Sequence, residues 1–499
     1  MNNNTRIFSI LVSVFFFWGF VAASNDILIP VFKSKMGLKQ WESQMIAFAF
    51  YVAYTIGSLI YIGLTKFAQF DMVKEWGYGK TIATGLFISA SGTLLFIPAS
   101  SFTENPTAAF PLELMGLMIV GIGFAFQQTA ANPLAILLGS HETGSQRLSM
   151  AGGINNVGTT IGPLIVNFAI FGALGSDKPE DIDLSTVKFP YLVLGALFVL
   201  FGIIFWRLKS NNLENSDIEL EKSDIESQKS GSTEVHETIP SAISFPQLWM
   251  GMIAIFLYVG VEVSTASNLP EYMKSQLNLN MSDIAPYISL FWASLMIGRW
   301  TSAAQAFNIQ PILKSALRWV LPFVAYGIYL GVNFLSGKEF TQFEYMGISA
   351  FWWYQLPILL LIILDWLCKG NPAKQLAIYS ATAIALILVG MYIQGVVGMF
   401  ALIAVGLFCS TLWPSIFALA ISGLGKSTGQ GSTLLIMMIM GGGFVSVFQG
   451  TLADIKSIGI EHSYWVGIFC FAYLHYYALE TSKNLKKQGI ELETPSGGH

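Results

Sequence analysis

Apolar runs long enough to cross a membrane recur from one end of the chain to the other, and no other feature limits the fold so strongly. A helix needs about 20 mostly apolar residues to cross about 30 Å of hydrocarbon. Of the 499 residues, 54% are hydrophobic and only 11% are charged, which excludes a string of soluble domains. The chain is therefore predicted to be an all-α polytopic membrane protein.

About 14 membrane helices are expected in total. They lie near residues 7–32, 41–65, 80–99, 110–138, 148–175, 189–208, 247–268, 284–307, 313–336, 345–368, 373–393, 395–423, 428–452 and 462–481. The first run lacks a small-residue cleavage site and is too long for a signal peptide, so we expect it to remain as the first helix.

A polar segment divides these runs into two sets. Residues 209–245 are rich in Ser, Glu, Asp and Lys and have almost no aromatic residues, a composition that predicts a disordered linker. The expected domains are an N-terminal six-helix bundle at 1–208, a C-terminal bundle at 246–482 and a tail at 483–499.

The distribution of basic residues predicts the orientation in the membrane. With the N-terminus in the cytoplasm, most of the 26 Lys and Arg residues fall on the cytoplasmic side, as the positive-inside rule requires. Lys33, Lys35 and Lys39, in the first outer loop, are the exception. We therefore expect an inner-membrane protein with both termini and the linker in the cytoplasm.

The two halves carry Pro and Gly interruptions at corresponding places. Asn132-Pro133 in the fourth run corresponds to Trp413-Pro414 in the second half, and the next run of each half has a glycine cluster. The clusters are Gly152, Gly153, Gly158 and Gly162 in the first half and Gly441, Gly442 and Gly443 in the second. Such symmetry is typical of transporters whose substrate site lies between the repeats. The alternative is that these glycines only allow close helix packing.

Amide, carboxyl and aromatic side chains occur inside the apolar runs. The candidate substrate-binding residues are Asn25, Tyr51, Gln127, Gln128, Asn132, Asn155, Asn156, Tyr258, Asn268, Trp292 and Trp413. Amides donate to and accept from hydroxyl groups, and aromatic rings stack on the C–H face of a sugar, so the set favours a neutral sugar over a nucleotide or a charged substrate. For any single amide, the alternative is an interhelical hydrogen bond that only holds the bundle together.

Two acids within these runs are candidates for coupling substrate movement to an ion. Asp26 lies in the first run, where a carboxylate is too costly to face lipid, and Glu262 lies in the seventh. A carboxyl group that is neutral toward one compartment and charged toward the other can couple proton entry to substrate entry, so both are predicted proton-coupling residues. A direct hydrogen bond to substrate is the alternative for Glu262. Arg299 is expected to be a conformational latch or a lipid-facing anchor, and Asp365 is expected to be solvated.

No metal, cofactor or enzyme site is expected. Cys368, Cys409 and Cys470 lack the spacing of metal ligands, and the five histidines lie in loops, tails or the last run.

Several motifs together resemble the major facilitator superfamily and, within it, the fucose permease and glucose/galactose transporter family. The matching segments are Asn25-Asp26-Ile27-Leu28-Ile29-Pro30, Ala130-Ala131-Asn132-Pro133, Arg147-Leu148, Asn155-Asn156-Val157-Gly158-Thr159-Thr160-Ile161-Gly162-Pro163, Tyr258-Val259-Gly260-Val261-Glu262-Val263-Ser264, Ile297-Gly298-Arg299, Trp413-Pro414-Ser415-Ile416-Phe417 and Gly441-Gly442-Gly443. They occur in the family's order and span both halves.

The resemblance implies a two-bundle fold of six plus six helices that imports a monosaccharide by proton symport with alternating access. Asp26 matches the family's acid in the first helix. At the position of the second acid of the fucose permease branch, this chain has Gln128. A glutamine at this position resembles the glucose/galactose branch. A segment at about 310–369 adds two helices to the family's twelve. Sodium coupling, or a sugar sensor that no longer transports, are the alternatives. The sugar, the coupling ion and the oligomeric state are left open.

Overall fold

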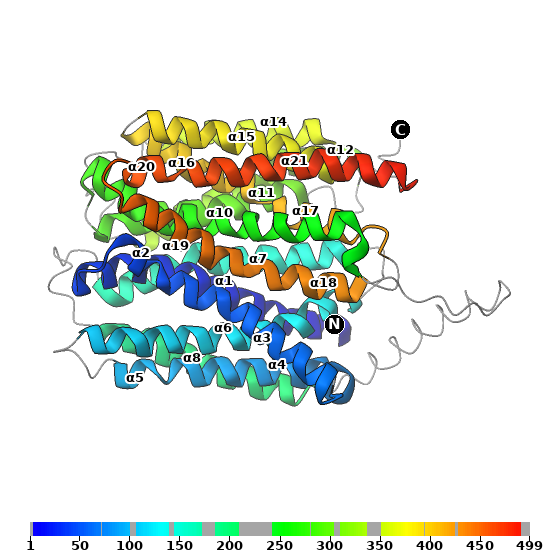
Figure 1. Ribbon diagram of the computed structural model, residues 1–499. Coiled ribbons are helices and arrows are strands. Elements are labelled where there is room, and N and C mark those ends of the chain that lie inside the picture. Colours follow the sequence, from blue (N-terminus) through cyan, green and yellow to red (C-terminus); the bar gives the residue numbers. More distant parts are fainter. Residues whose placement is uncertain are drawn as a thin grey trace.

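The computed structural model describes residues 3–70, 72–99, 106–138, 144–171, 185–208, 242–279, 281–303, 310–336, 351–393, 395–424 and 428–490. Within these residues every regular element is a helix (Figure 1).

The first group of helices ends before the polar segment. It comprises α1 (Asn3–Met36), α2 (Gln40–Ser43), α3 (Met45–Phe67), α4 (Met72–Thr93), α5 (Phe96–Ala99), α6 (Pro106–Leu137), α7 (Gly144–Phe171) and α8 (Ser185–Trp206). Helix α7 packs on α1, while α6 packs on both α3 and α4. In Figure 1 these helices, coloured blue to blue-green, form the lower part of the molecule.

The second group follows the polar segment. It comprises η3 (Ala242–Ser244), α10 (Pro246–Leu277), α11 (Met281–Ala303), α12 (Pro311–Ser336), α14 (Gln355–Cys368), α15 (Pro372–Tyr392), α16 (Val396–Cys409), α17 (Leu412–Ile421), α18 (Thr428–Met437), η7 (Met438–Met440), α19 (Gly441–Ala453), α20 (Gly459–Ser463) and α21 (Trp465–Lys487). Helix α10 packs on α19 and α21, and α15 packs on α16 and α21.

Ten spans in the described residues are long and apolar enough to cross a membrane. The four other expected spans coincide with helices α7, α8, α11 and α21. Helix α7 carries the two adjacent amides Asn155 and Asn156, and α11 carries Asp283 and Arg299.

The runs expected at 395–423 and 428–452 are each interrupted near their middle. Residues 410–411 separate α16 from α17, and Thr411 there leaves the helical region with φ −111° and ψ 3°. In the other run η7 separates α18 from α19. A Cβ atom on Gly441 would lie 1.9 Å from the Phe256 carbonyl oxygen, so only glycine lets this segment approach α10 so closely.

A cluster of polar side chains around the buried Asp365 attaches α12 and α14 to the rest of the second group. We call Ser302, Arg318, Asp365, Gln375 and Tyr379 the Asp365 cluster. The Asp365 carboxylate forms an ion pair with Arg318 at 3.4 Å and accepts hydrogen bonds from Ser302 Oγ (2.8 Å), Gln375 Nε2 (3.0 Å) and Tyr379 OH (3.3 Å). Asp365 is 1% exposed, so the expectation that it is solvated is wrong. Sequence position suggested a surface, but α11, α12 and α15 cover it.

The two groups meet along several helix pairs. Helix α7 packs on α11, α3 packs on α19, and the end of α1 with α2 packs on α10 and α19. Residues that belong to one of these contacts can affect how the groups move relative to each other.

Candidate functional site

Glu262, Tyr258 and Arg299 gather in the middle of the second group. The partly exposed Glu262 carboxyl interacts with the Tyr258 hydroxyl, one turn earlier on α10, and with the Arg299 guanidinium of α11. Tyr258 OH also donates to the Cys409 carbonyl oxygen at 3.1 Å. The carboxyl therefore lies within electrostatic range of a hydroxyl group and a cation, and both can respond to its protonation.

Arg299 connects the two groups of helices. Its Nε donates to the Ser410 carbonyl oxygen at 3.0 Å, where α16 ends, and its Nη1 donates to the Gly152 carbonyl oxygen of α7 at 3.2 Å. A Cβ atom on Gly152 would lie 3.0 Å from Nη1, so the glycine gives the guanidinium access. Of the two roles expected for Arg299, these bonds favour a conformational latch over a lipid-facing anchor.

The adjacent glutamines of α6 have different environments. Gln127 is fully buried, accepts from Trp18 Nε1 (2.9 Å) and donates to Ser89 Oγ (3.0 Å), all within the first group. Gln128 is partly exposed and donates to Tyr54 OH at 3.3 Å. Because Gln127 already uses its amide to join α1, α4 and α6, the contacts favour a structural role for Gln127 and leave Gln128 as the ligand candidate.

The asparagines of α7 differ in the same way. Asn155 Nδ2 donates to the Phe15 carbonyl oxygen at 2.8 Å, which ties α7 to α1. Asn156 is 1% exposed, and its Nδ2 has no hydrogen-bond partner within the described part of the chain. A buried donor without a partner is costly, so Asn156 is the stronger ligand candidate of the two. Asn132 on α6 is partly exposed.

The aromatic candidates come from both groups of helices. The Tyr51 ring lies across from Gly442, whose added Cβ would be 2.9 Å from Tyr51 Cγ. Trp292 is 4% exposed in the centre of α11. Trp413, partly exposed at the start of α17, stacks on Phe417 with ring centroids 5.0 Å apart.

Three other predicted residues do not join this site in the described structure. Asn25 and Asp26 lie within α1, but their side chains are outside the described part of the structure. Asn268 is described, is fully buried, and accepts from Gln40 Nε2 at 3.0 Å. Asn268 therefore belongs to a second polar cluster, at the end of the molecule where α1 ends.

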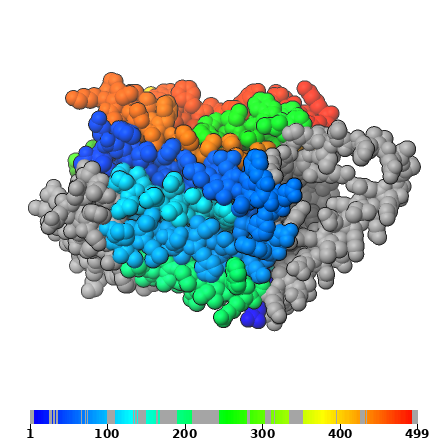
Figure 2. Space-filling view, turned by 60° about the horizontal axis from the view of Figure 1, so that its bottom comes forward, coloured from blue at the N-terminus to red at the C-terminus, as the bar shows by residue number. Residues whose placement is uncertain are grey.

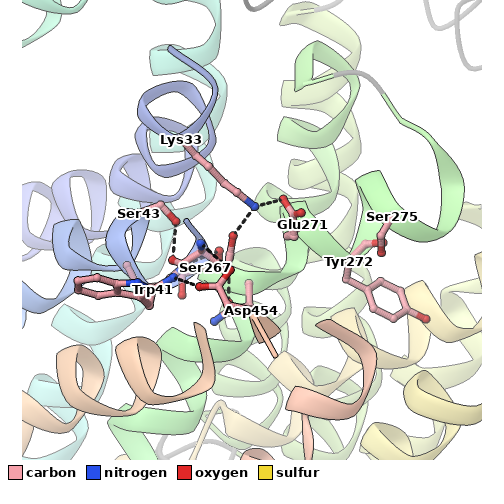
Figure 3. Close-up of polar contacts among 11 residues, drawn as sticks. Lys33, Trp41, Ser43, Ser267, Glu271, Tyr272, Ser275 and Asp454 are labelled. Atoms are coloured by element: carbon pink, nitrogen blue, oxygen red, sulfur yellow. Dashed lines mark hydrogen bonds and ion pairs between the residues drawn. The ribbon is translucent and has the colours of Figure 1, made fainter. Parts of the chain in front are cut away.

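This second cluster is centred on the short helix α2, and Figure 3 shows part of it. We call Lys33, Gln40, Trp41, Asn268, Glu271 and Asp454 the α2 cluster. Lys33 Nζ forms an ion pair with Glu271 at 2.7 Å and donates to Gln40 Oε1 at 2.8 Å. The Asp454 carboxylate accepts from the backbone N–H groups of Gln40 (3.1 Å) and Trp41 (3.0 Å).

Sequence analysis missed the α2 cluster except for Asn268. One signal pointed to it, since Lys33 was an exception to the positive-inside rule. The ion pair with Glu271 accounts for that lysine. Glu113 was also missed. It is 3% exposed in α6, and its Oε2 has no hydrogen-bond partner among the described residues.

Comparisons with known proteins support the motif resemblance. The sequence model of the Major Facilitator Superfamily matches residues 10–363. The chain is 31% identical to the glucose/galactose transporter of Brucella abortus over 476 residues, covering 95% of this chain and 93% of that protein. It is 26% identical to the L-fucose-proton symporter of Escherichia coli over 487 residues, covering 94% of this chain and 92% of that protein.

The fold is also similar to a solved structure. The crystal structure of the major facilitator transporter FucP in the outward conformation matches with a TM-score of 0.62 at 24% identity, covering 96% of this chain and all of that one.

Proposed function

The chain belongs to the major facilitator superfamily, in the family of fucose permeases and glucose/galactose transporters, and we propose that it imports a neutral monosaccharide together with a proton. It is a multi-pass membrane transporter with the major facilitator fold and not an enzyme. The relatives' names support a sugar as substrate, and the L-fucose-proton symporter supports a proton as coupling ion.

One observation carries the proposal of coupling. Glu262 interacts with Arg299, and Arg299 bonds to a backbone carbonyl of the other group of helices. Protonation of Glu262 removes a negative charge beside the guanidinium, and this changes the electrostatic energy of Arg299 in its bridging position. A proton on Glu262 is thereby linked to the relative position of the two groups. We propose Asp26 as the second proton-coupling residue, on the basis of the motif it shares with the family.

The hydrogen-bonding ligands are proposed from amides that are partly exposed or have a buried donor without a partner among the described residues. Gln128, Asn132 and Asn156 supply hydrogen bonds to hydroxyl groups, with Asn25 as a further ligand from α1. Trp292, Trp413, Tyr51 and Tyr258 supply aromatic surface and a hydroxyl group. Gln127 and Asn155 have structural roles, because their amides bond within the first group, and Asn268 bonds to Gln40 in the α2 cluster.

We also propose the arrangement in the membrane. The N-terminus and C-terminus are cytoplasmic, so α1 ends at the outer surface, and the two groups of helices are six-helix bundles to which α12 and α14 are added. The ends of these two helices support this placement. The exposed side chains Trp352 (72%) and Trp353 (69%) mark one end, and Trp319 (48%) and Trp366 (62%) mark the other, as expected for the two membrane interfaces.

Uptake into proteoliposomes tests the proposed substrate and ion together. A panel of labelled hexoses, deoxyhexoses and N-acetyl sugars is assayed under an inward proton gradient, under a sodium gradient, and without either. We expect at least one neutral hexose or deoxyhexose to accumulate with the proton gradient alone. Accumulation with sodium alone would replace the proton by sodium, and binding without any accumulation would indicate a sensor.

The carboxyl variants test the coupling residues. Glu262→Gln and Asp26→Asn should each abolish accumulation against a gradient, about a tenfold loss or more, while exchange of labelled for unlabelled sugar continues. The matched control is Glu75→Gln, an exposed acid on α4. If Glu262→Gln accumulates sugar normally, Glu262 has only a structural role.

A further inference from the structure

We propose that the α2 cluster is the outer gate of the transport path, a latch that must open and close in every cycle. The inference rests on the proposed function only for the direction in which α1 crosses the membrane. Its first basis is connectivity. The ion pair and hydrogen bonds from Lys33 and Gln40 to Glu271 and Asn268 join α1 and α2 of the first group to α10 of the second.

Gln40 connects the parts of the latch. Its Oε1 accepts from Lys33, its Nε2 donates to Asn268, and its backbone N–H donates to Asp454. One residue of the first group therefore contacts both α10 and the end of α19. Separating the groups at this end breaks these bonds together.

The Asp454 carboxylate binds the first backbone N–H groups of helix α2. The first N–H groups of a helix have no partner inside the helix, and they carry partial positive charge. The two oxygens of Asp454 accept from Gln40 N and Trp41 N, with no side chain of α2 involved. A carboxylate of the second group thus completes a helix of the first group only when the gate is closed.

Two glycines bring the backbone of α19 close to α3, next to the α2 cluster. Added Cβ atoms on Gly442 and Gly443 of α19 would lie 2.9 Å from Tyr51 Cγ and 2.7 Å from Phe48 Cα. At Gly442 the α19 backbone lies against the Tyr51 ring, and at Gly443 it lies against the backbone of α3, while the Phe48 and Phe444 rings pack beside them with centroids 5.0 Å apart. Parting of α3 from this segment breaks one hydrogen bond among the described residues, from Thr55 Oγ1 to the Met437 carbonyl oxygen at 2.8 Å.

The charges of the latch can be rehydrated when it opens. The side chains of Lys33 and Glu271 are 22% and 27% exposed. Partly solvated ion pairs contribute little net stability, so parting them costs far less than parting a fully buried pair. This is the property that a reversible gate needs.

A cysteine under the latch reports whether it is open. Ser267 is 1% exposed, its carbonyl accepts from Gln44 Nε2, and its Oγ has no hydrogen-bond partner among the described residues, so Ser267→Cys breaks no bond seen there. The native residues Cys368, Cys409 and Cys470 are all buried and give a low background. The measured quantity is the rate at which a membrane-impermeant maleimide labels the new cysteine in right-side-out membrane vesicles, without any sugar.

Charge changes at the latch should change this rate in a reciprocal way. Lys33→Glu and Glu271→Lys should each raise the labelling rate about tenfold, because each places like charges together. The double variant Lys33→Glu with Glu271→Lys should restore the slow rate. Asp454→Asn should raise the rate by a smaller factor. The control is Lys274→Glu, an exposed lysine on the same helix as Glu271, which should leave the rate unchanged.

The outcomes separate the gate from the other proposals. Unchanged labelling in both single charge variants, or a double variant that stays fast, would overturn the latch. Proper folding of each variant is checked by gel filtration in detergent and by thermal unfolding, and Lys33→Met provides a neutral second variant. Labelling that occurs only in inside-out vesicles would overturn the assumed direction of α1. No sugar is used, so failure of the sugar proposal would not affect the result.

Discussion

The α2 cluster and the Asp365 cluster are both built around a carboxylate and a cation, yet they differ in what they join. The α2 cluster connects the two groups of helices, and each member of its ion pair keeps about a quarter of its side chain exposed. The Asp365 cluster connects α11, α12, α14 and α15 within the second group, and its carboxylate is 1% exposed. One network crosses the boundary between the two groups of helices, and the other lies inside one of them.

The difference follows from the cost of breaking each network. Removing one partner of a buried ion pair costs about 3–5 kcal/mol, whereas an exposed pair contributes about 0–1 kcal/mol. Contacts that part in every cycle must be cheap to break, while contacts inside a rigid group can be expensive. We therefore expect variants of the Asp365 cluster to change stability and variants of the α2 cluster to change conformation.

The largest expected effect is on stability. Asp365→Ala should lower the free energy of unfolding by about 3–5 kcal/mol, because it removes the buried carboxylate that pairs with Arg318 and accepts three side-chain hydrogen bonds. Thermal unfolding of the purified protein in detergent measures the change, and Glu75→Ala, at an exposed acid, is the control. A stable Asp365→Ala protein that fails to transport would place Asp365 in the mechanism and break the comparison.

An intermediate effect is expected where α3 meets α19. Gly442→Ala should hinder closure of the outer gate, because the new Cβ would lie 2.9 Å from the Tyr51 ring, and overpacking of this kind costs about 1–3 kcal/mol. Its labelling rate in the Ser267→Cys background should rise. Gly327→Ala is the matched control, since nothing lies within 4 Å of a Cβ added there. Equal labelling in the two variants would contradict a close contact at Gly442.

The smallest expected effect sharpens the contrast. Lys33→Met should lower the free energy of unfolding by about 1 kcal/mol or less, because the ion pair that it removes is partly solvated. The same thermal unfolding assay used for Asp365→Ala measures it. A loss as large as that of Asp365→Ala would show that the two clusters contribute equally to the stability of the fold.

Local composition was enough to predict the helices, and the site residues stay predictions. Apolar runs located the helices, and the glycine clusters lie on α7 and α19, two helices that pack on the other group. The sequence could not distinguish Gln127 from Gln128, because neighbouring residues of a helix point about 100° apart and the rotation depends on packing. One points into its own bundle toward Trp18, and the other toward Tyr54.

Long-range partners were beyond the reach of sequence patterns. Gln40 bonds to a residue 228 positions away and to another 414 positions away, and no periodicity connects them. Asp365 was misjudged for the same reason, since the helices that bury it include α11, which is distant in sequence. Buried charges depend on which helices become neighbours, and hydropathy alone does not determine that.

Proton movement driven by sugar is the most direct test of the account. Lightly buffered cells that express the protein are placed in a pH electrode vessel without an energy source, and a transported hexose is added. We predict alkalinisation of the medium that disappears with Glu262→Gln and with a protonophore. Sugar uptake without any change in the external pH would contradict proton symport.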